Sequence, residues 1–240
     1  MVNKDFYTTA ELAKILRVSR VAVFNKIKNG DIKAQKLGRN FVIFEKDIDI
    51  NGLLSSLFKD AKEWAISQKK ISDDFYCQNS AIFQARLVKM ETLMLKNKDA
   101  KKLYSLLTSI AGEIGNNSYD HNLGQWPDAP GIFFGYDLNK KQIVLADRGL
   151  GVLKTLQRVK TGLKNHKDAL KVAFTEIISG RTPEARGNGL KYVKNVISKN
   201  SINLEFQSGD AKLILRGKNA DIIIENAAEN IRGCLALITY

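Results

Sequence analysis

The stretch IAGEIGNNSYDHN, residues 110–122, sets a carboxylate and two asparagines into an otherwise apolar segment whose spacing predicts a helix. Glu113 and Asn117 stand four residues apart, so on a helix their side chains share one face at about 6 Å. Asp120 follows about one turn further along. Such a polar stripe is either a solvated surface or a site where a carboxylate and an amide act on one ligand. This segment alone leaves both alternatives open.

Two glycine-containing stretches further along the chain favour the ligand site. In LADRGLGV, Asp147 ends a predicted strand and is followed by Gly149 and Gly151. A carboxylate there can accept a hydrogen bond from an exocyclic amine, and the glycines let a ligand approach the backbone closely. In RGNGLKYV, residues 186–193, a glycine pair leads directly into a predicted helix. Its backbone N–H groups would form an anion site suited to phosphates.

The chain from residue 131 onward has a mixed α/β pattern. Helices are expected at 168–179 and 188–199, and strands at 131–137, 142–147, 202–207, 212–217, 221–226 and 234–240. Because the four late strands follow one another with short turns, the sheet should be mixed and largely antiparallel. Helices should cover one face of it.

The first fifty residues have a different pattern, with two short helices and then a hairpin. Thr8 or Thr9 can cap a helix over TTAELAKIL, and Ser19 can cap a second helix over SRVAVFNKIKN, which stops at Gly30. Val21, Phe24 and Ile27 are expected on the inner face of the second helix. Two alternating strands then follow, joined by the turn at residues 38–40.

Residues 7–48 resemble the winged helix-turn-helix of the excisionase and MerR-like DNA-binding families. The second helix would enter the major groove, with short polar or basic side chains near its N-terminus, and the wing tip would contact phosphate or the minor groove. The candidate DNA-binding residues are Ser19, Arg20, Asn25, Lys26, Lys28 and Arg39. The alternative is a small helical interaction module, or protein adaptor, whose basic residues are only solvated.

The three boxes EIGNNSYD, DRGLG and RGNGL, in that order, resemble the N, G1 and G2 boxes of the GHKL ATPase superfamily. This superfamily includes gyrase B, large heat-shock chaperones, histidine kinases and MutL, and the resemblance covers about residues 101–240. It implies a Bergerat-type fold, a two-layer α/β sandwich with a mixed, largely antiparallel sheet. The whole chain would then be of the α+β class.

The resemblance also assigns roles to residues. Glu113 would be the general base that activates water, Asn117 would hold Mg²⁺ between the phosphates, and Asp147 would bind the adenine amino group. Asp120 would line the base pocket and Gly149 and Gly151 would form its floor, while Gly187, Asn188 and Gly189 would wrap the phosphates. Residues 152–186 would contain a mobile lid.

The sequence departs from some members of the superfamily. The two histidines are His121, inside the N box, and His166, in the expected lid, so no histidine is placed to accept phosphate as in histidine kinases. His121 is expected at a pocket edge or on the surface. Gyrase and MutL complete their sites with a lysine from a following domain, and nothing follows Tyr240. We therefore expect slow Mg-dependent ATP hydrolysis, or hydrolysis assisted by a partner chain.

The chain therefore divides into a DNA-binding domain at residues 1–50, a helical connector at 51–100 and an ATP-binding domain at 101–240. The connector carries apolar stripes that could form a helical hairpin, packed either on its own domain or in a dimer interface. Helix-turn-helix proteins commonly read two half-sites, which favours a homodimer.

The composition agrees with a globular protein and favours an anionic partner, although nucleic acid, nucleotide phosphates or simple solubility would each fit its charge. The chain has 240 residues, 44% of them hydrophobic, and a formal net charge of +13 that is spread along its length. The sequence has neither a signal peptide nor an apolar run long enough for a membrane span, and its two cysteines fit a reducing compartment, so we expect a cytoplasmic location.

Three functions remain open from the sequence. The first is an ATP-binding, DNA-binding regulator of transcription whose nucleotide state modulates DNA or partner binding. The second is an anti-sigma-type protein kinase or regulator with an adaptor helix-turn-helix. The third is a catalytically inactive nucleotide-binding scaffold.

Overall fold

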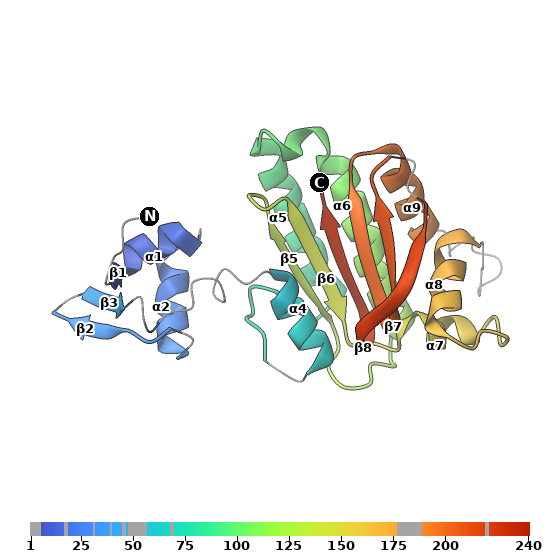
Figure 1. Cartoon of the computed structure of the whole chain (residues 1–240), viewed down its shortest axis with the longest axis horizontal. Coiled ribbons are helices and arrows are strands. Elements are labelled where there is room, and N and C mark those ends of the chain that lie inside the picture. The colour runs from blue at the N-terminus through green and yellow to red at the C-terminus, as the bar shows by residue number, and fades with distance from the viewer. Residues whose placement is uncertain are drawn as a thin grey trace. The chain divides into compact units, whose positions relative to one another are not determined.

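The chain is of the α+β class and forms two compact units, Met1–Ser56 and Leu57–Tyr240 (Figure 1). The computed structural model describes residues 6–16, 19–30, 32–38, 40–44, 47, 57–67, 70–176, 189–218 and 221–240. Among these described residues, no helix is both long and apolar enough to cross a membrane.

The first unit is a helix-turn-helix with a small antiparallel sheet. Its elements are β1 (Phe6–Thr8), α1 (Thr9–Leu16), α2 (Arg20–Lys28), β2 (Gln35–Leu37) and β3 (Asn40–Phe44). The strand order is β1-β3-β2, so β3 pairs with both neighbours. The expected helices and hairpin are confirmed, and β1 adds a third strand.

Side-chain caps explain where these two helices begin. The Thr8 amide donates to Glu11 Oε2 at 2.9 Å, and the Glu11 amide donates to Thr8 Oγ1 at 3.2 Å. This reciprocal pair is a capping box, so Thr8 caps α1 and Thr9 lies buried in its first turn. The Ala22 amide donates to Ser19 Oγ at 3.1 Å, which confirms the cap on α2.

The core of the first unit differs from the expectation on α2. It consists of Leu12, Ala13, Val23, Ile32 and Ile43. Val23 and the partly buried Ile27, one turn apart, form the inner face of α2. Val21 is 66% exposed and Phe24 is 39% exposed, so the expectation that they face inward was wrong.

The second unit is a five-stranded sheet with helices on both faces. Its helices are α4 (Leu57–Ile66), α5 (Ser80–Lys96), η2 (Ala100–Lys102), α6 (Tyr104–Asn122), α7 (Gly151–Gln157), α8 (His166–Thr175) and α9 (Gly189–Lys199). Its strands are β4 (Tyr76–Cys77), β5 (Ile132–Asp137), β6 (Gln142–Asp147), β7 (Asn203–Arg216) and β8 (Ile223–Thr239). The order is β4-β5-β6-β8-β7, and every pairing between these strands is antiparallel.

The four late strands expected from the sequence are two long strands. β7 and β8 run through the positions where short turns were expected, and their register shifts around Ser208 and Gly209. Gly209 and Gly233 have φ values of +62° and +76°, which glycine adopts without strain. Such irregularities bend a strand without ending it, so both strands continue past their glycines.

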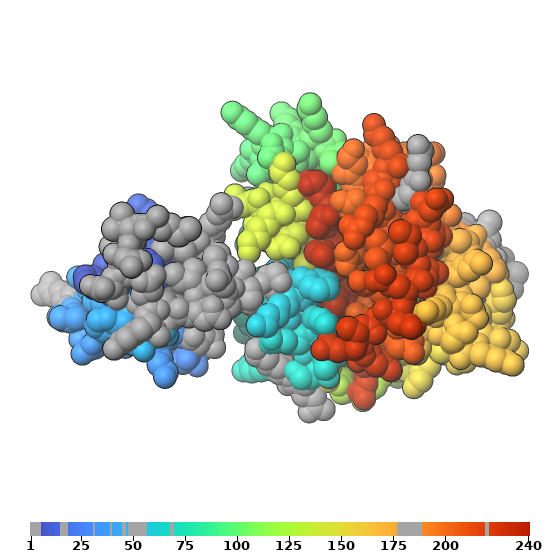
Figure 2. All heavy atoms as spheres, viewed as in Figure 1, coloured from blue at the N-terminus to red at the C-terminus, as the bar shows by residue number. Residues whose placement is uncertain are grey.

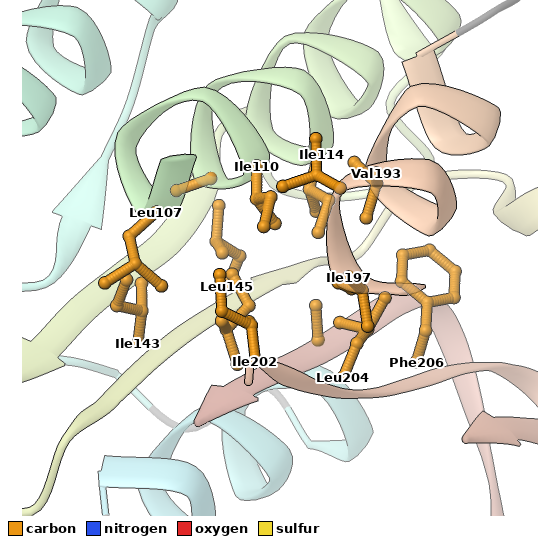
Figure 3. Packing of buried hydrophobic residues seen from close by; sticks show 14 of the residues in the cluster. Leu107, Ile110, Ile114, Ile143, Leu145, Val193, Ile197, Ile202, Leu204 and Phe206 are labelled. Carbon is orange, nitrogen blue, oxygen red and sulfur yellow. The ribbon is translucent and has the colours of Figure 1, made fainter. Parts of the chain in front are cut away.

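The main core lies between the sheet and one layer of helices. Alternate residues of β5 and β6, such as Phe134 and Ile143, face α5, α6, α8 and α9 on this side. Figure 3 shows α6 and α9 residues, among them Ile110, Ile114 and Ile197, packed onto strand residues of this face.

The opposite face of the sheet carries α4. Ala61, Trp64 and Ala65 of α4 pack on Phe133 and Val144, whose neighbours along the strands face the main core. Figure 2 shows α4 (cyan) covering part of this face, beside the orange and red surface of β7 and β8.

Residues 57–100, expected to connect two domains, therefore pack into the second unit on both sides of its sheet. α4 and α5 do not form a helical hairpin, because edge strand β4 lies between them in the chain and they cover opposite faces. Of the expected apolar residues in this part, Leu53 and Leu54 lie outside the described residues.

Candidate functional site

A cavity of about 820 Å³, counted with its open mouth, lies between the sheet and helices α6, α7, α8 and α9. The sequence boxes, separate in the chain, all reach it: α6 carries the first, the end of β6 and the start of α7 carry the second, and the start of α9 carries the described part of the third.

One face of α6 lines the cavity. The lining residues follow helical spacing and are Ile114, Asn117, Ser118, His121 and Asn122. Asp120 is exposed and lies outside this set, because position 120 falls on another side of the helix from positions 117, 118 and 121. The structure therefore does not place Asp120 in the base pocket. Asn116 also faces away, and its Oδ1 accepts from Gln84 Nε2 at 2.8 Å.

Asp147 is the buried carboxylate of the site, with 2% of its surface exposed. Ser118 Oγ donates to Asp147 Oδ2 at 2.8 Å, and the Gly149 amide donates to Oδ1 at 2.8 Å. Burial raises the pKa of Asp147 to about 6, although these hydrogen bonds favour its charged form. The carboxylate has further lone pairs, so it can still accept a hydrogen bond from a ligand amine inside the cavity.

Two glycines make room for this arrangement. A Cβ on Gly233 would lie 2.2 Å from the Asp147 carbonyl oxygen and 2.5 Å from Asp147 Oδ1. A Cβ on Gly149 would lie 2.1 Å from Asn122 Nδ2. Gly149 therefore supports the cavity by admitting the Asn122 side chain, whereas Gly151 lines the cavity directly.

Two polar side chains that the sequence did not single out hold the glycine-rich turn in place. Asn122 Oδ1 accepts from the Leu150 amide at 2.8 Å. Ser208 Oγ accepts from the Val152 amide at 2.9 Å and donates to the Gly233 carbonyl at 3.0 Å. Asn122 could have been found by continuing the helical period from Asn117 and Ser118. Ser208 gave no comparable signal, because its partners are distant in the sequence.

Asn117 and Gly189 line the polar end of the cavity, and Glu113 lies beside them without being one of the lining residues. A Cβ on Gly189 would lie 2.5 Å from Glu113 Oε2 and 3.2 Å from Asn117 Nδ2, so an alanine at this position would crowd both side chains. Gly189 begins α9, whose first N–H groups and helix dipole favour an anion at this end. Gly187 and Asn188 lie outside the described residues.

Lys191 adds a cation in the first turn of α9 and lines the same cavity. Its Nζ donates to the Glu176 carbonyl oxygen, and burial lowers the pKa of this lysine. The expected lid stretch, residues 152–186, contains α7, α8 and Glu176 at the cavity wall. Its end lies outside the described residues.

The cavity also has an apolar part. Its wall is formed by Ile114, Val152, Leu156, Val172 and Phe206. Cys234 lies beside Asp147, and burial together with the neighbouring carboxylate raises the pKa of its thiol. One cavity thus combines an apolar slot containing a buried carboxylate with a polar end at a helix N-terminus.

No group of three or more His, Cys, Asp or Glu side chains in the described part of the chain could hold a metal ion. The side-chain oxygens of Glu113 and Asn117 are hard ligands of the kind that Mg²⁺ accepts. Because Mg²⁺ is often bound by one or two protein groups together with substrate phosphates, this donor set fits a metal that arrives with a nucleotide.

The other candidate surface is the exposed face of α2 in the first unit. Ser19, Arg20, Asn25 and Lys28 are exposed and Lys26 is half-buried, as a surface that contacts DNA requires. Phe24 lies on the same helix, in edge-to-face contact with Phe41 at 5.7 Å between ring centres. Arg39 lies outside the described residues.

Residues 6–50 match the family model of the helix-turn-helix domain. The match confirms the helix-turn-helix expected at the N-terminus. A search of curated proteins finds no match to this chain.

Solved structures similar to the chain include two ATPase domains. One is the 43K ATPase domain of Thermus thermophilus gyrase B with an aminocoumarin, at a TM-score of 0.33 and 14% identity, over 54% of this chain and 32% of that chain. Another is the ATP-binding domain of Francisella tularensis topoisomerase IV with a small-molecule inhibitor, at a TM-score of 0.34 and 15% identity. That match covers 60% of this chain and 40% of that chain.

Proposed function

We propose that the Leu57–Tyr240 unit binds ATP in the cavity and that its nucleotide state modulates DNA binding by the first unit. The observation that supports this proposal is the meeting of three separate sequence boxes around one cavity, which Asn117, Asp147 and Gly189 line, with Asp147 buried and the Glu113 carboxylate next to Gly189.

The two parts of the cavity suit the two parts of a nucleotide. An adenine ring would occupy the apolar slot near Val152 and Phe206, with its amino group donating to Asp147. The phosphates would lie toward the start of α9, where Gly189 permits close approach and Lys191 supplies positive charge. The recognition of base and phosphates is therefore divided between β6 and α9.

Hydrolysis would use Glu113 at the polar end. A carboxylate beside the phosphates can accept a proton from an attacking water, which is the role of a general base. Asn117 would hold Mg²⁺, which when bound would neutralise charge on the phosphates. We propose slow ATP turnover, because Lys191 is the one lysine or arginine among the described residues that line the cavity.

DNA binding would use α2 as the recognition helix. Exposed Arg20, Asn25 and Lys28 can reach base edges and phosphates, while the buried Val23 holds the helix on its own core. We propose that the protein acts as a homodimer, because two helix-turn-helix units can then read two half-sites.

Coupling requires that ATP bind one arrangement of the protein better than another. Arg148 offers a physical connection inside the second unit, because it follows Asp147 directly and its side chain reaches α4. Arg148 Nη1 donates to the Trp64 carbonyl at 3.1 Å and to the Ser67 carbonyl. α4 is the first element after the unit boundary at Ser56, so a nucleotide that moves the 147–151 turn would also act on α4.

Nucleotide-induced thermal stabilisation tests the binding proposal. At 100 times its dissociation constant, Mg-ATP should stabilise the second unit by about 2.7 kcal/mol. Asp147→Asn should lose most of this stabilisation. In asparagine an amide nitrogen, which only donates, takes the place of one of the two acceptor oxygens of the carboxylate. Asp221→Asn, at an exposed position, is the matched control and should behave as wild type. Equal stabilisation of the wild type and Asp147→Asn would contradict the assignment.

A further inference from the structure

α5 is apolar on two opposite faces, although it packs on the second unit through only one of them. Its buried face consists of Phe83, Leu87, Met90 and Met94, which contact the main core. An outer helix of a globular unit ordinarily has a polar solvent face. The outer face of α5 therefore requires its own explanation.

The outer face carries a regular stripe of small and apolar side chains. It consists of Ala81, Ala85, Val88, Thr92 and Leu95, all of them exposed, and its one hydroxyl, Thr92 Oγ1, donates to the Val88 carbonyl at 2.9 Å. The spacings alternate between four and three residues, which is the pattern of the a and d positions in a coiled coil. Val88 is 58% exposed and Leu95 is 41% exposed, so the larger apolar side chains of the stripe face solvent in the single chain.

The charged residues beside the stripe identify the partner. Glu91 flanks one side of it, and Lys89 and Lys96 flank the other. In a parallel pair of helices, each g position faces the e position five residues later in the partner, which brings Glu91 opposite Lys96 of a second copy. In an antiparallel pair the lysine flanks would face each other and repel.

We infer that α5 is the dimer interface, and that two copies of this chain pair their α5 helices in parallel along this stripe. The inference rests on the homodimer proposed above and adds the surface and the orientation. A two-fold interface is self-complementary, and a stripe with an acidic residue on one side and basic residues on the other meets that condition when the helices run parallel.

Sedimentation of the full chain over a series of concentrations tests the surface. Wild type should form a dimer, and Val88→Asp should raise the dimer dissociation constant at least about 100-fold, because two unpaired carboxylates would be buried at the seam. Val159→Asp is the matched control, since Val159 is 46% exposed outside the stripe. Thermal unfolding should show that both variants remain folded.

A charge exchange tests the orientation. Glu91→Lys and Lys96→Glu should each weaken the dimer by roughly tenfold, and the double variant should restore it, because opposite charges again face each other. A wild type that stays monomeric would overturn both the dimer and its interface. A dimer that survives Val88→Asp would overturn the interface alone, and a double variant no better than the single ones would overturn the parallel orientation. ATP and DNA binding can be measured separately on the same samples.

Discussion

Gly189→Ala is a small change that should lower the rate of ATP turnover without lowering the stability of the fold. Gly189 begins α9, and its backbone lies outside the left-handed region, so alanine can adopt the same conformation. Alanine also has a higher helix propensity than glycine. The substitution should therefore leave the second unit folded, with its stability equal to or slightly above that of the wild type.

The added methyl group acts on the catalytic candidates. It would lie 2.5 Å from Glu113 Oε2, whereas ordinary van der Waals contact begins at 3.4 Å. The Glu113 carboxylate must then move by about 0.9 Å, which its flexible side chain permits. A misplacement of about 1 Å in a reacting group can lower a rate about 100-fold. We expect a loss of that size in the rate of ATP turnover.

Single-turnover hydrolysis of Mg-ATP and nucleotide titration measure the two effects separately. Turnover should fall about 100-fold, while adenosine binding should change little because Asp147, the proposed adenine contact, is not among the residues that the added methyl group would meet. Gly112→Ala is the matched control, since its methyl group would meet Leu87 at an ordinary 3.4 Å. If Gly189→Ala turned over ATP within twofold of the wild-type rate, Glu113 would not be the general base whose position next to Gly189 matters.

Three further predictions follow from buried positions. Gly115→Ala would place a methyl group 2.2 Å from Cζ of the buried Phe83 ring, so urea unfolding should show a loss of about 1–3 kcal/mol, and a loss below about 0.5 kcal/mol would contradict this packing. Because burial raises the pKa of Asp147 to about 6, protonation should weaken ATP binding as the pH falls below 6, and the same titration of Asp147→Asn should lack this limb. The pH dependence of stability has the opposite direction. The contribution of Asp147 to the free energy of unfolding is present in full below its ordinary pKa of 3.8 and is lost as the pH rises through about 6. Unfolding of the nucleotide-free protein at a series of pH values measures this. Arg148→Met would remove a buried guanidinium that pairs with Asp128, which keeps Arg232 as a second cation, so the free energy of unfolding should fall by about 1–3 kcal/mol, and a neutral effect in denaturant titration would show that the pair is not stabilising.

The first unit could be predicted well because its signals are local. Thr8 and Ser19 are caps whose partners lie three residues away, and the hairpin follows from alternation around one glycine. The inner face of α2 was predicted less well. In a helix of nine residues, Val21 and Phe24 define an apolar pair as plausible as Val23 and Ile27, and only packing against α1 and β3 selects between them.

In the second unit, local sequence patterns predicted the candidate site residues but not the course of the strands or the side of the sheet that each helix covers. The spacing of Glu113 and Asn117 and the glycines after Asp147 pointed to the cavity, whose walls the structure brings together from α6 to α9. Gly209 and Gly233 resemble turn residues in sequence, yet they bend two continuous strands. The amphipathic pattern of α4 predicts one buried face, but a single helix carries no signal for which side of the sheet it will cover.

DNA affinity measured with and without Mg-ATP at one fixed salt concentration, on the wild type and on Asp147→Asn, tests the proposed coupling most directly. Salt must be fixed because phosphate contacts make affinity depend steeply on it. Mg-ATP should change the DNA dissociation constant of the wild type at least about fivefold, the lower range of allosteric coupling, and should leave that of Asp147→Asn unchanged. An equal DNA affinity of the wild type in both conditions would contradict the proposed coupling.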